Sequence, residues 1–172
     1  MLKVYGFVLK LSMILLYGGV GCSSHKVHTN DIPVIYKKEF SEIIVRNQIN
    51  IVLGWATWCS SCNETFSVVE SLEKTYENKD ISLSITSILL DDKNINKEID
   101  VPAWMVAKLF VSGEEPEVLM SVLSEKWIAS VPFIVVTSKV PENENIKIKY
   151  FYGLDEIRRV GRFVEFLRYE ME

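Results

Sequence analysis

Residues 51–62 read Ile-Val-Leu-Gly-Trp-Ala-Thr-Trp-Cys-Ser-Ser-Cys, and the rest of the chain is interpreted from this stretch. Its first half is an apolar run rich in strand-forming residues, and the residues after Cys62 are typical of a helix. The sequence therefore predicts a strand that enters a helix through a Cys-x-x-Cys spacing. In this setting the spacing is typical of redox chemistry.

The predicted helix gives the two cysteines different properties. Unpaired backbone N–H groups and the macrodipole at a helix N-terminus favour negative charge. Cys59 would lie at that end, so its thiolate is stabilised and the pKa of its thiol is lowered. Cys62 would lie one turn further along the helix, less exposed and within reach of Cys59 to close a disulfide.

A Cys-x-x-Cys pair has two other interpretations. Zinc takes about four ligands, and the further candidates are Cys22, His25 and His28, which lie in a polar segment near the N-terminus. The pair could also be two inert cysteines in a core. The strand-then-helix setting with the flanking Trp58 favours redox chemistry over both, and we expect no metal site.

Residues 55–62, Trp-Ala-Thr-Trp-Cys-Ser-Ser-Cys, resemble the active-site segment of the thioredoxin superfamily. This segment is most similar in sequence to that of the membrane-tethered, TlpA-like proteins of the bacterial envelope. Ser130-Val131-Pro132 before the apolar run 133–136 resembles the cis-proline that faces the disulfide in this family. The resemblance covers residues 32–170. It implies an α/β, thioredoxin-like fold with a mixed central sheet flanked by helices.

The resemblance also implies the function of a thiol–disulfide oxidoreductase. Its redox group would be the Cys59–Cys62 disulfide, with no further cofactor: Cys59 attacks a partner disulfide, and Cys62 then releases the reduced partner. Trp58 would cover one side of the disulfide, and Val131 and Pro132 would contact an extended substrate. The expected partners are protein thiols or disulfides and a membrane electron donor. The resemblance therefore favours a protein that acts as a reductant over one that acts as an oxidant.

Three positions depart from the family pattern. The strand position that carries a buried acid in thioredoxins is Leu53. The helix position that carries a glutamate in many TlpA-like proteins is Thr65, with Glu64 beside it. Ser67 replaces a helix-kinking proline, which predicts a straighter helix. A buried acid would help to deprotonate Cys62, so without one the second step should be slower at neutral pH.

Residues 1–21 have the layout of a secretory signal peptide, with a short basic start, an apolar run and small residues. Gly19-Val20-Gly21-Cys22 resembles a bacterial lipobox, although Gly19 stands where leucine is usual. We therefore expect lipidation of Cys22, which gives the third cysteine a role. The alternative is a cleaved signal or an uncleaved anchor with a free Cys22 thiol. Lys10 interrupts the apolar run, which is short for a membrane span.

The predicted organisation is a lipoprotein-type signal peptide over 1–21, a polar tether over 22–30 and one thioredoxin-like domain over 31–172. A length of 172 residues with 48% hydrophobic and 24% charged residues suits a single domain. The net charge of −4, without a basic stripe, argues against a nucleic-acid partner. We expect a periplasmic or otherwise extracytoplasmic location in the bacterial cell envelope, lipid-anchored to the membrane.

The expected elements follow thioredoxin topology. Strands are predicted at 32–36, 49–55, 81–90, 133–137 and 146–152, and helices at 37–47, 60–77 and 154–170. The helix over 60–77 has a buried face formed by Phe66, Val69, Leu72 and Tyr76. A turn is expected at 91–94. Two more helices, at 100–110 and around 118–123, would complete a helical insertion over 91–130, before the cis-proline strand. This insertion either shapes partner specificity or covers the sheet.

One alternative function belongs to a different class. The protein could be a non-catalytic binding or chaperone-like lipoprotein in which Cys59–Cys62 is a structural disulfide. A copper chaperone is a third interpretation, but it usually has wider cysteine spacing and a distal histidine, and no histidine follows His28. The reduction potential of the pair distinguishes a reductant, an oxidant and an inert disulfide.

Overall fold

A computed structural model describes residues 24–79, 81–91, 95–123, 130–139 and 146–171. They form a mixed six-stranded sheet in the order β2-β6-β4-β3-β7-β8. The strands are β2 (Val34–Ile35), β3 (Ile49–Trp55), β4 (Leu83–Leu89), β6 (Leu109–Ser112), β7 (Phe133–Lys139) and β8 (Ile146–Tyr152). β3 pairs in parallel with β4 and antiparallel with β7, so the strand that leads to the cysteines lies inside the sheet.

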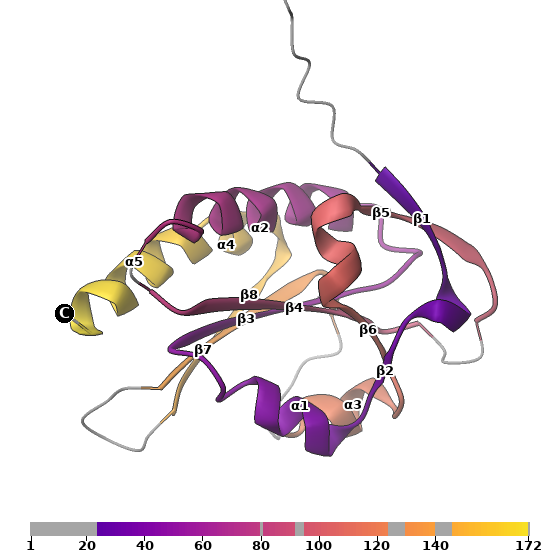
Figure 1. Ribbon diagram of the computed structural model, residues 1–172, viewed down its shortest axis with the longest axis horizontal. Helices are drawn as coiled ribbons and strands as arrows, with labels where there is room; N and C mark the ends of the chain where they lie inside the picture. The colour runs from indigo at the N-terminus through magenta and orange to yellow at the C-terminus, as the bar shows by residue number, and fades with distance from the viewer. Residues whose placement is uncertain (1–23, 80, 92–94, 124–129, 140–145, 172) are drawn as a thin grey trace, which may run out of the picture.

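Helices cover both faces of this sheet (Figure 1). The helices α2 (Cys62–Tyr76), α4 (Gly153–Ile157) and α5 (Val160–Met171) lie on one face, and α1 (Lys37–Ile43) and α3 (Pro116–Met120) lie on the other. All seven residues of β3 are buried, as its apolar run predicts for a strand covered on both faces. The predicted fold class is therefore confirmed.

The element after the cysteines also agrees with the sequence pattern. The predicted buried face of α2 is confirmed, because Phe66, Val69, Leu72 and Tyr76 are all buried. The helix begins at Cys62 and not at residue 60, with Ser61 as its N-cap residue, so Cys62 is its first residue and does not lie one turn inside it as predicted. The predicted final helix over 154–170 is instead two helices, α4 and α5, separated by a turn at the exposed, charged residues 158–159.

The prediction of a helix over residues 100–110 is wrong. These residues form part of β5 (Glu98–Pro102), the 3₁₀ helix η2 (Ala103–Lys108) and the start of β6. Ile99 and Val101 are buried while Glu98 and Asp100 are exposed, which is the period of two that a half-buried strand shows. The insertion therefore adds strand β6 between β2 and β4, and α3 is its one short α-helix among the described residues.

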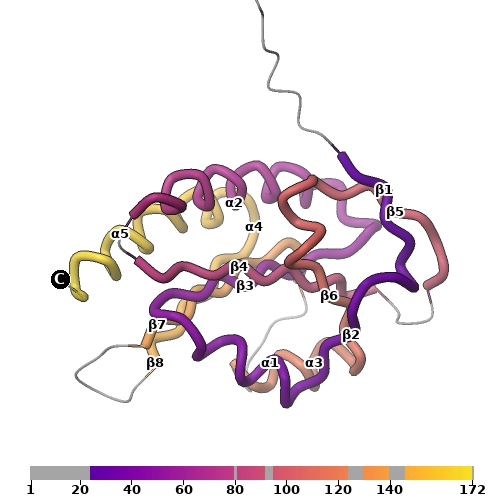
Figure 2. Tube along the Cα trace, viewed as in Figure 1, coloured from indigo at the N-terminus to yellow at the C-terminus, as the bar shows by residue number. Residues whose placement is uncertain are grey.

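Residues 24–30 also differ from the expectation of a tether. Residues 24–28 form β1 (Ser24–His28), which pairs antiparallel with β5 along its whole length. Lys26 forms a 2.7 Å ion pair with Glu98 across the two strands. We call this pair of strands the β1–β5 ribbon; it lies beside the N-terminal part of α2 (Figure 2), where Ser24 and Asn63 border one pocket.

The N-terminal predictions concern residues that the structure does not describe. The predicted signal peptide over 1–21 and Cys22 lie outside the described residues. Within the described ranges, no helix has the length and apolar character that crossing a membrane requires.

Gly54 allows β7 to lie close against β3. A Cβ atom at this position would be 2.1 Å from Cε1 and Cζ of the Phe133 ring. Phe133 is fully buried and directly follows Pro132. Packing of this ring on Gly54 therefore holds the proline segment beside the strand that leads to Cys59.

We expect Gly54→Ala to lower the free energy of unfolding by about 1–3 kcal/mol, because the added methyl group must displace a buried ring. Urea unfolding of the oxidised protein measures the change. Adding Phe133→Leu to Gly54→Ala should recover part of the loss, since leucine lacks the ring atoms that clash. An unfolding midpoint for Gly54→Ala equal to that of the wild type would contradict this packing.

Candidate active site

Cys59 and Cys62 form a disulfide, with their Cα atoms 5.5 Å apart. Cys59 lies in the turn after β3, where its N–H donates to the Ala56 carbonyl oxygen at 3.1 Å, and Cys62 is the first residue of α2. Cys62 is 1% exposed, whereas Cys59 is only partly buried. The two sulfurs are therefore unequal, and Cys59 is the more accessible one.

The predicted proline segment lies next to this turn. The Val131–Pro132 peptide bond is cis, as the resemblance implied. Phe133, the next residue, pairs with Gly54 in the antiparallel register of β7 and β3. Pro132 therefore lies beside the end of β3 from which the chain continues to Cys59.

The two tryptophans near the cysteines have different environments. Trp55 is buried, its Nε1–H donates to Ser87 Oγ at 2.9 Å, and its ring meets Phe66 edge-on at 5.1 Å. Trp58 is 74% exposed and borders the same pocket as Cys59. Trp55 is thus a core residue, and Trp58 offers an apolar surface beside the more accessible sulfur.

Neither family position supplies an acid to Cys62. Leu53 is fully buried on β3. Thr65 is also fully buried, and its Oγ1 has no hydrogen-bond partner in the part of the chain that the structure describes. The neighbouring Glu64 is exposed and lies 3.3 Å from Nη2 of Arg158. Proton removal from Cys62 therefore has no carboxylate at these positions to assist it.

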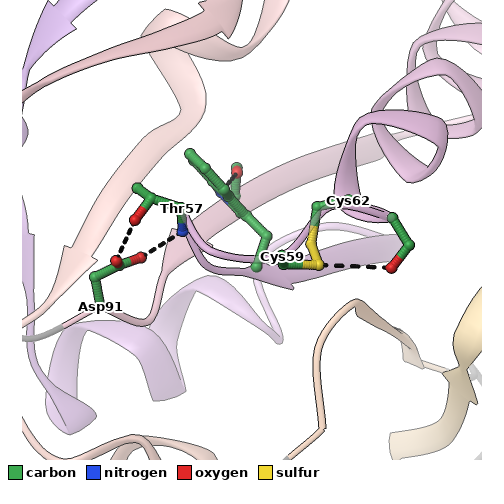
Figure 3. Close-up of a disulfide and its surroundings, with 7 residues drawn as sticks. Thr57, Cys59, Cys62 and Asp91 are labelled. Carbon is green, nitrogen blue, oxygen red and sulfur yellow. Dashed lines mark hydrogen bonds between the residues drawn. A yellow bond between two sulfur atoms is a disulfide. The ribbon is translucent and has the colours of Figure 1, made fainter.

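Sequence reasoning did not single out Asp91, whose side chain is 4% exposed. Its Oδ2 accepts the Thr57 N–H at 2.7 Å, and its Oδ1 accepts the Thr57 hydroxyl at 2.5 Å (Figure 3). The sequence feature that could have identified Asp91 is its position just after β4. The carboxyl ends of neighbouring parallel strands meet at one edge of a sheet, so Asp91 lies near the end of β3. The predicted turn over 91–94 is described only at Asp91.

Lys97 is the second residue that sequence reasoning did not single out. Its Nζ donates to Thr57 Oγ1 and lies 3.9 Å from Asp91 Oδ1. No local pattern marked it, because its place depends on the chain path that leads into β5. Together Thr57, Asp91 and Lys97 attach the turn before Cys59 to the end of β4 and to the insertion.

A pocket of about 520 Å³ opens beside the disulfide. The turn after β3 and the first turn of α2 form one side, and residues 97–100 form another. Lys97 brings a positive charge to the pocket, and Glu98 and Asp100 bring negative charges. The insertion thus contributes to the surroundings of Cys59 rather than only covering the sheet.

The histidines considered as zinc ligands are not among the residues that line this pocket. His25 and His28 are exposed on β1, and His28 Nδ1 accepts the Asn30 N–H at 3.4 Å. In the ranges that the structure describes, no three His, Cys, Asp or Glu side chains are grouped to hold a metal ion. Cys22 lies outside those ranges, so the expectation of no metal site stays a prediction for the whole chain.

Comparisons with known proteins find similar sequences and similar folds. Residues 31–132 match the family model for thioredoxin. The thioredoxins of Pyropia yezoensis and Porphyra purpurea are each 24% identical to this chain over 93 residues, which is 53% of this chain and 84% of theirs.

Solved structures of similar proteins have low sequence identity. A thioredoxin-related protein from Neisseria meningitidis serogroup B is 18% identical, with a TM-score of 0.49 over 72% of this chain and 85% of that one. A thioredoxin-family thiol:disulfide interchange protein from Chlorobium tepidum TLS is 18% identical, with a TM-score of 0.46 over 70% and 79% of the two chains. Because the family model spans more than half of the sequence, including both cysteines and Pro132, the chain belongs to the thioredoxin family.

Proposed function

We propose that this protein is a thiol–disulfide oxidoreductase of the bacterial cell envelope that reduces disulfides in partner proteins. The observation that carries the proposal is the unequal cysteine pair. Cys59 borders an open pocket, and Cys62 is 1% exposed at the start of α2. A partner can therefore reach one sulfur, while the other is placed to displace what the first has captured.

The reaction would proceed in two exchanges. In the reduced protein, the Cys59 thiolate attacks one sulfur of a partner disulfide; a mixed disulfide forms, and the partner's other sulfur leaves as a thiolate and takes a proton from water. Cys62 then loses its proton and attacks Cys59 Sγ. The mixed disulfide breaks, the Cys59–Cys62 bond forms, and the partner's second sulfur leaves. Two electrons have passed to the partner, and a membrane electron donor would restore the dithiol.

The second exchange needs a base for Cys62. Because Leu53 and Thr65 occupy the family's acid positions, water or a group of the bound partner would take this proton. We therefore expect the second exchange to be slow at neutral pH and to accelerate as the pH rises toward the pKa of the thiol.

Substrate would bind along the proline segment and Trp58. Val131 is partly buried, and its neighbour Pro132 adjoins the strand that leads to Cys59. A partner segment in extended conformation would pair with the Val131 backbone, as peptides do when they add to exposed backbone groups. Trp58 would cover an apolar part of that segment.

The proposed location rests on the N-terminal sequence. Cys22 is separated from the start of β1 at Ser24 by one residue. Successive Cα atoms are about 3.8 Å apart, so a lipid on Cys22 would hold the β1–β5 ribbon within about 10 Å of the anchored residue. Because the ribbon borders the pocket beside Cys59, such an anchor would suit partners at the membrane surface.

A non-catalytic binding protein with a structural disulfide is the second candidate. The observation in its favour is that neither family position carries an acid to activate Cys62. This candidate predicts a disulfide that resists reduction and captures no partner.

We expect Cys62→Ala to accumulate a mixed disulfide with insulin, since Cys59 can attack but nothing releases the product. Cys59→Ala should accumulate none, because Cys62 is buried. Non-reducing gel electrophoresis after mixing measures both. The wild-type pair should have a reduction potential above about −300 mV in thiol redox buffers. A lower potential together with no trapped species would favour the binding protein.

Expression in a bacterial host with a labelled fatty acid should label the protein, and Cys22→Ala should abolish the label, because the thioether forms at that cysteine. Cys59→Ala is the matched control and should stay labelled. Detection of Met1 on the mature chain by mass spectrometry would refute processing.

A further inference from the structure

We propose that Lys97, a residue of the insertion, is a positioning residue that stabilises the thiolate of Cys59. This inference deepens the proposed function and rests on it. The argument uses three observations: how the turn before Cys59 is fixed, how Lys97 is held, and which charges border the pocket.

Asp91 fixes the turn before Cys59. Its two carboxylate oxygens accept from the backbone N–H and the hydroxyl of Thr57, two residues before the cysteine. A buried carboxylate requires such partners, because its desolvation is costly without them. The position of the turn is therefore set from the end of β4.

Lys97 is held at both its backbone and its side chain. Its carbonyl oxygen accepts the Thr29 N–H at 3.0 Å, and its own N–H donates to Thr29 Oγ1 at 3.1 Å. At the other end, Nζ donates to Thr57 Oγ1, whose single proton is given to Asp91. The ammonium group is thus placed beside the turn that carries Cys59, although its side chain remains 41% exposed.

The charges that border the pocket have opposite signs. Among the described residues that line it, Lys97 is the only cation, and Glu98 and Asp100 are the acids. Glu98 is paired with Lys26 at 2.7 Å. On the packed elements, Glu64 of α2 pairs with Arg158, and Asp91 faces Thr57.

Opening of the disulfide places a negative charge on Cys59 Sγ. A nearby cation favours that charge and a nearby carboxylate disfavours it. Lys97 should therefore lower the pKa of the Cys59 thiol, and Asp100 should raise it. A purely structural role for either residue would not give shifts of opposite sign.

The test measures the rate at which iodoacetamide alkylates Cys59 in the reduced full-length protein as a function of pH, followed on the Cys59 peptide by mass spectrometry. Lys97→Met should raise the pKa of Cys59 and slow alkylation about threefold or more below that pKa, where a half-unit shift changes the thiolate fraction about threefold. Lys97→Arg should restore the wild-type profile. Asp100→Asn should speed alkylation.

The charge-matched control is Lys79→Met. Lys79 follows the far end of α2 and pairs with Glu165, about 20 Å along the helix from Cys62. Its loss should leave the alkylation profile of Cys59 unchanged.

An alkylation profile for Lys97→Met identical to that of the wild type would overturn the proposal, as would a slower rate for Asp100→Asn. If Lys97→Met fails to fold, Lys97→Gln decides in its place, because its amide N–H can still donate to Thr57 Oγ1 while the charge is lost. Intact trapping of insulin by Cys62→Ala with no effect of Lys97→Met refutes only the role of Lys97. Shifted alkylation without any trapping refutes the proposed exchange reaction instead.

Discussion

The pairing of β3 with β4 on one side and β7 on the other is the constraint on which the site depends. It brings three separate parts of the chain to one edge of the sheet. β3 ends before Cys59, β4 ends before Asp91, and β7 begins after Pro132. Because all seven residues of β3 are buried, a shift of its register would place its side chains on the wrong faces, so the edge is fixed by the whole core.

The β1–β5 ribbon changes what surrounds the redox pair. The general fold provides the disulfide, the helix and the proline, whereas the ribbon and the residues that lead into it provide the charged side of the pocket. Thr29 joins the ribbon to Lys97, and Lys97 reaches Thr57. A polar segment that the sequence pattern suggests is a tether is therefore connected by hydrogen bonds to the turn before Cys59.

The charged side chains around the two cysteines are placed differently from the family pattern. Leu53 and Thr65 remove the expected acids from the surroundings of Cys62, and the Thr65 hydroxyl is left without a partner among the described residues. Charged groups occur instead around the more accessible sulfur, in Lys97, Glu98 and Asp100. The described charged groups that line the pocket are therefore near Cys59, while the two family acid positions near Cys62 are uncharged.

The sequence by itself determined β3, the buried face of α2, the cysteine pair and the proline segment, because each depends on a local pattern: an apolar run, a repeat of three and four residues, or a short motif. Only the tertiary structure decided that residues 100–110 begin in a strand, that residues 24–28 pair with it, and that Asp91 and Lys97 meet Thr57. The physical reason is that a strand is stabilised by its partner, and here β1 and β5 pair between residues as far apart in the sequence as Val27 and Ile99. No local window contains both strands.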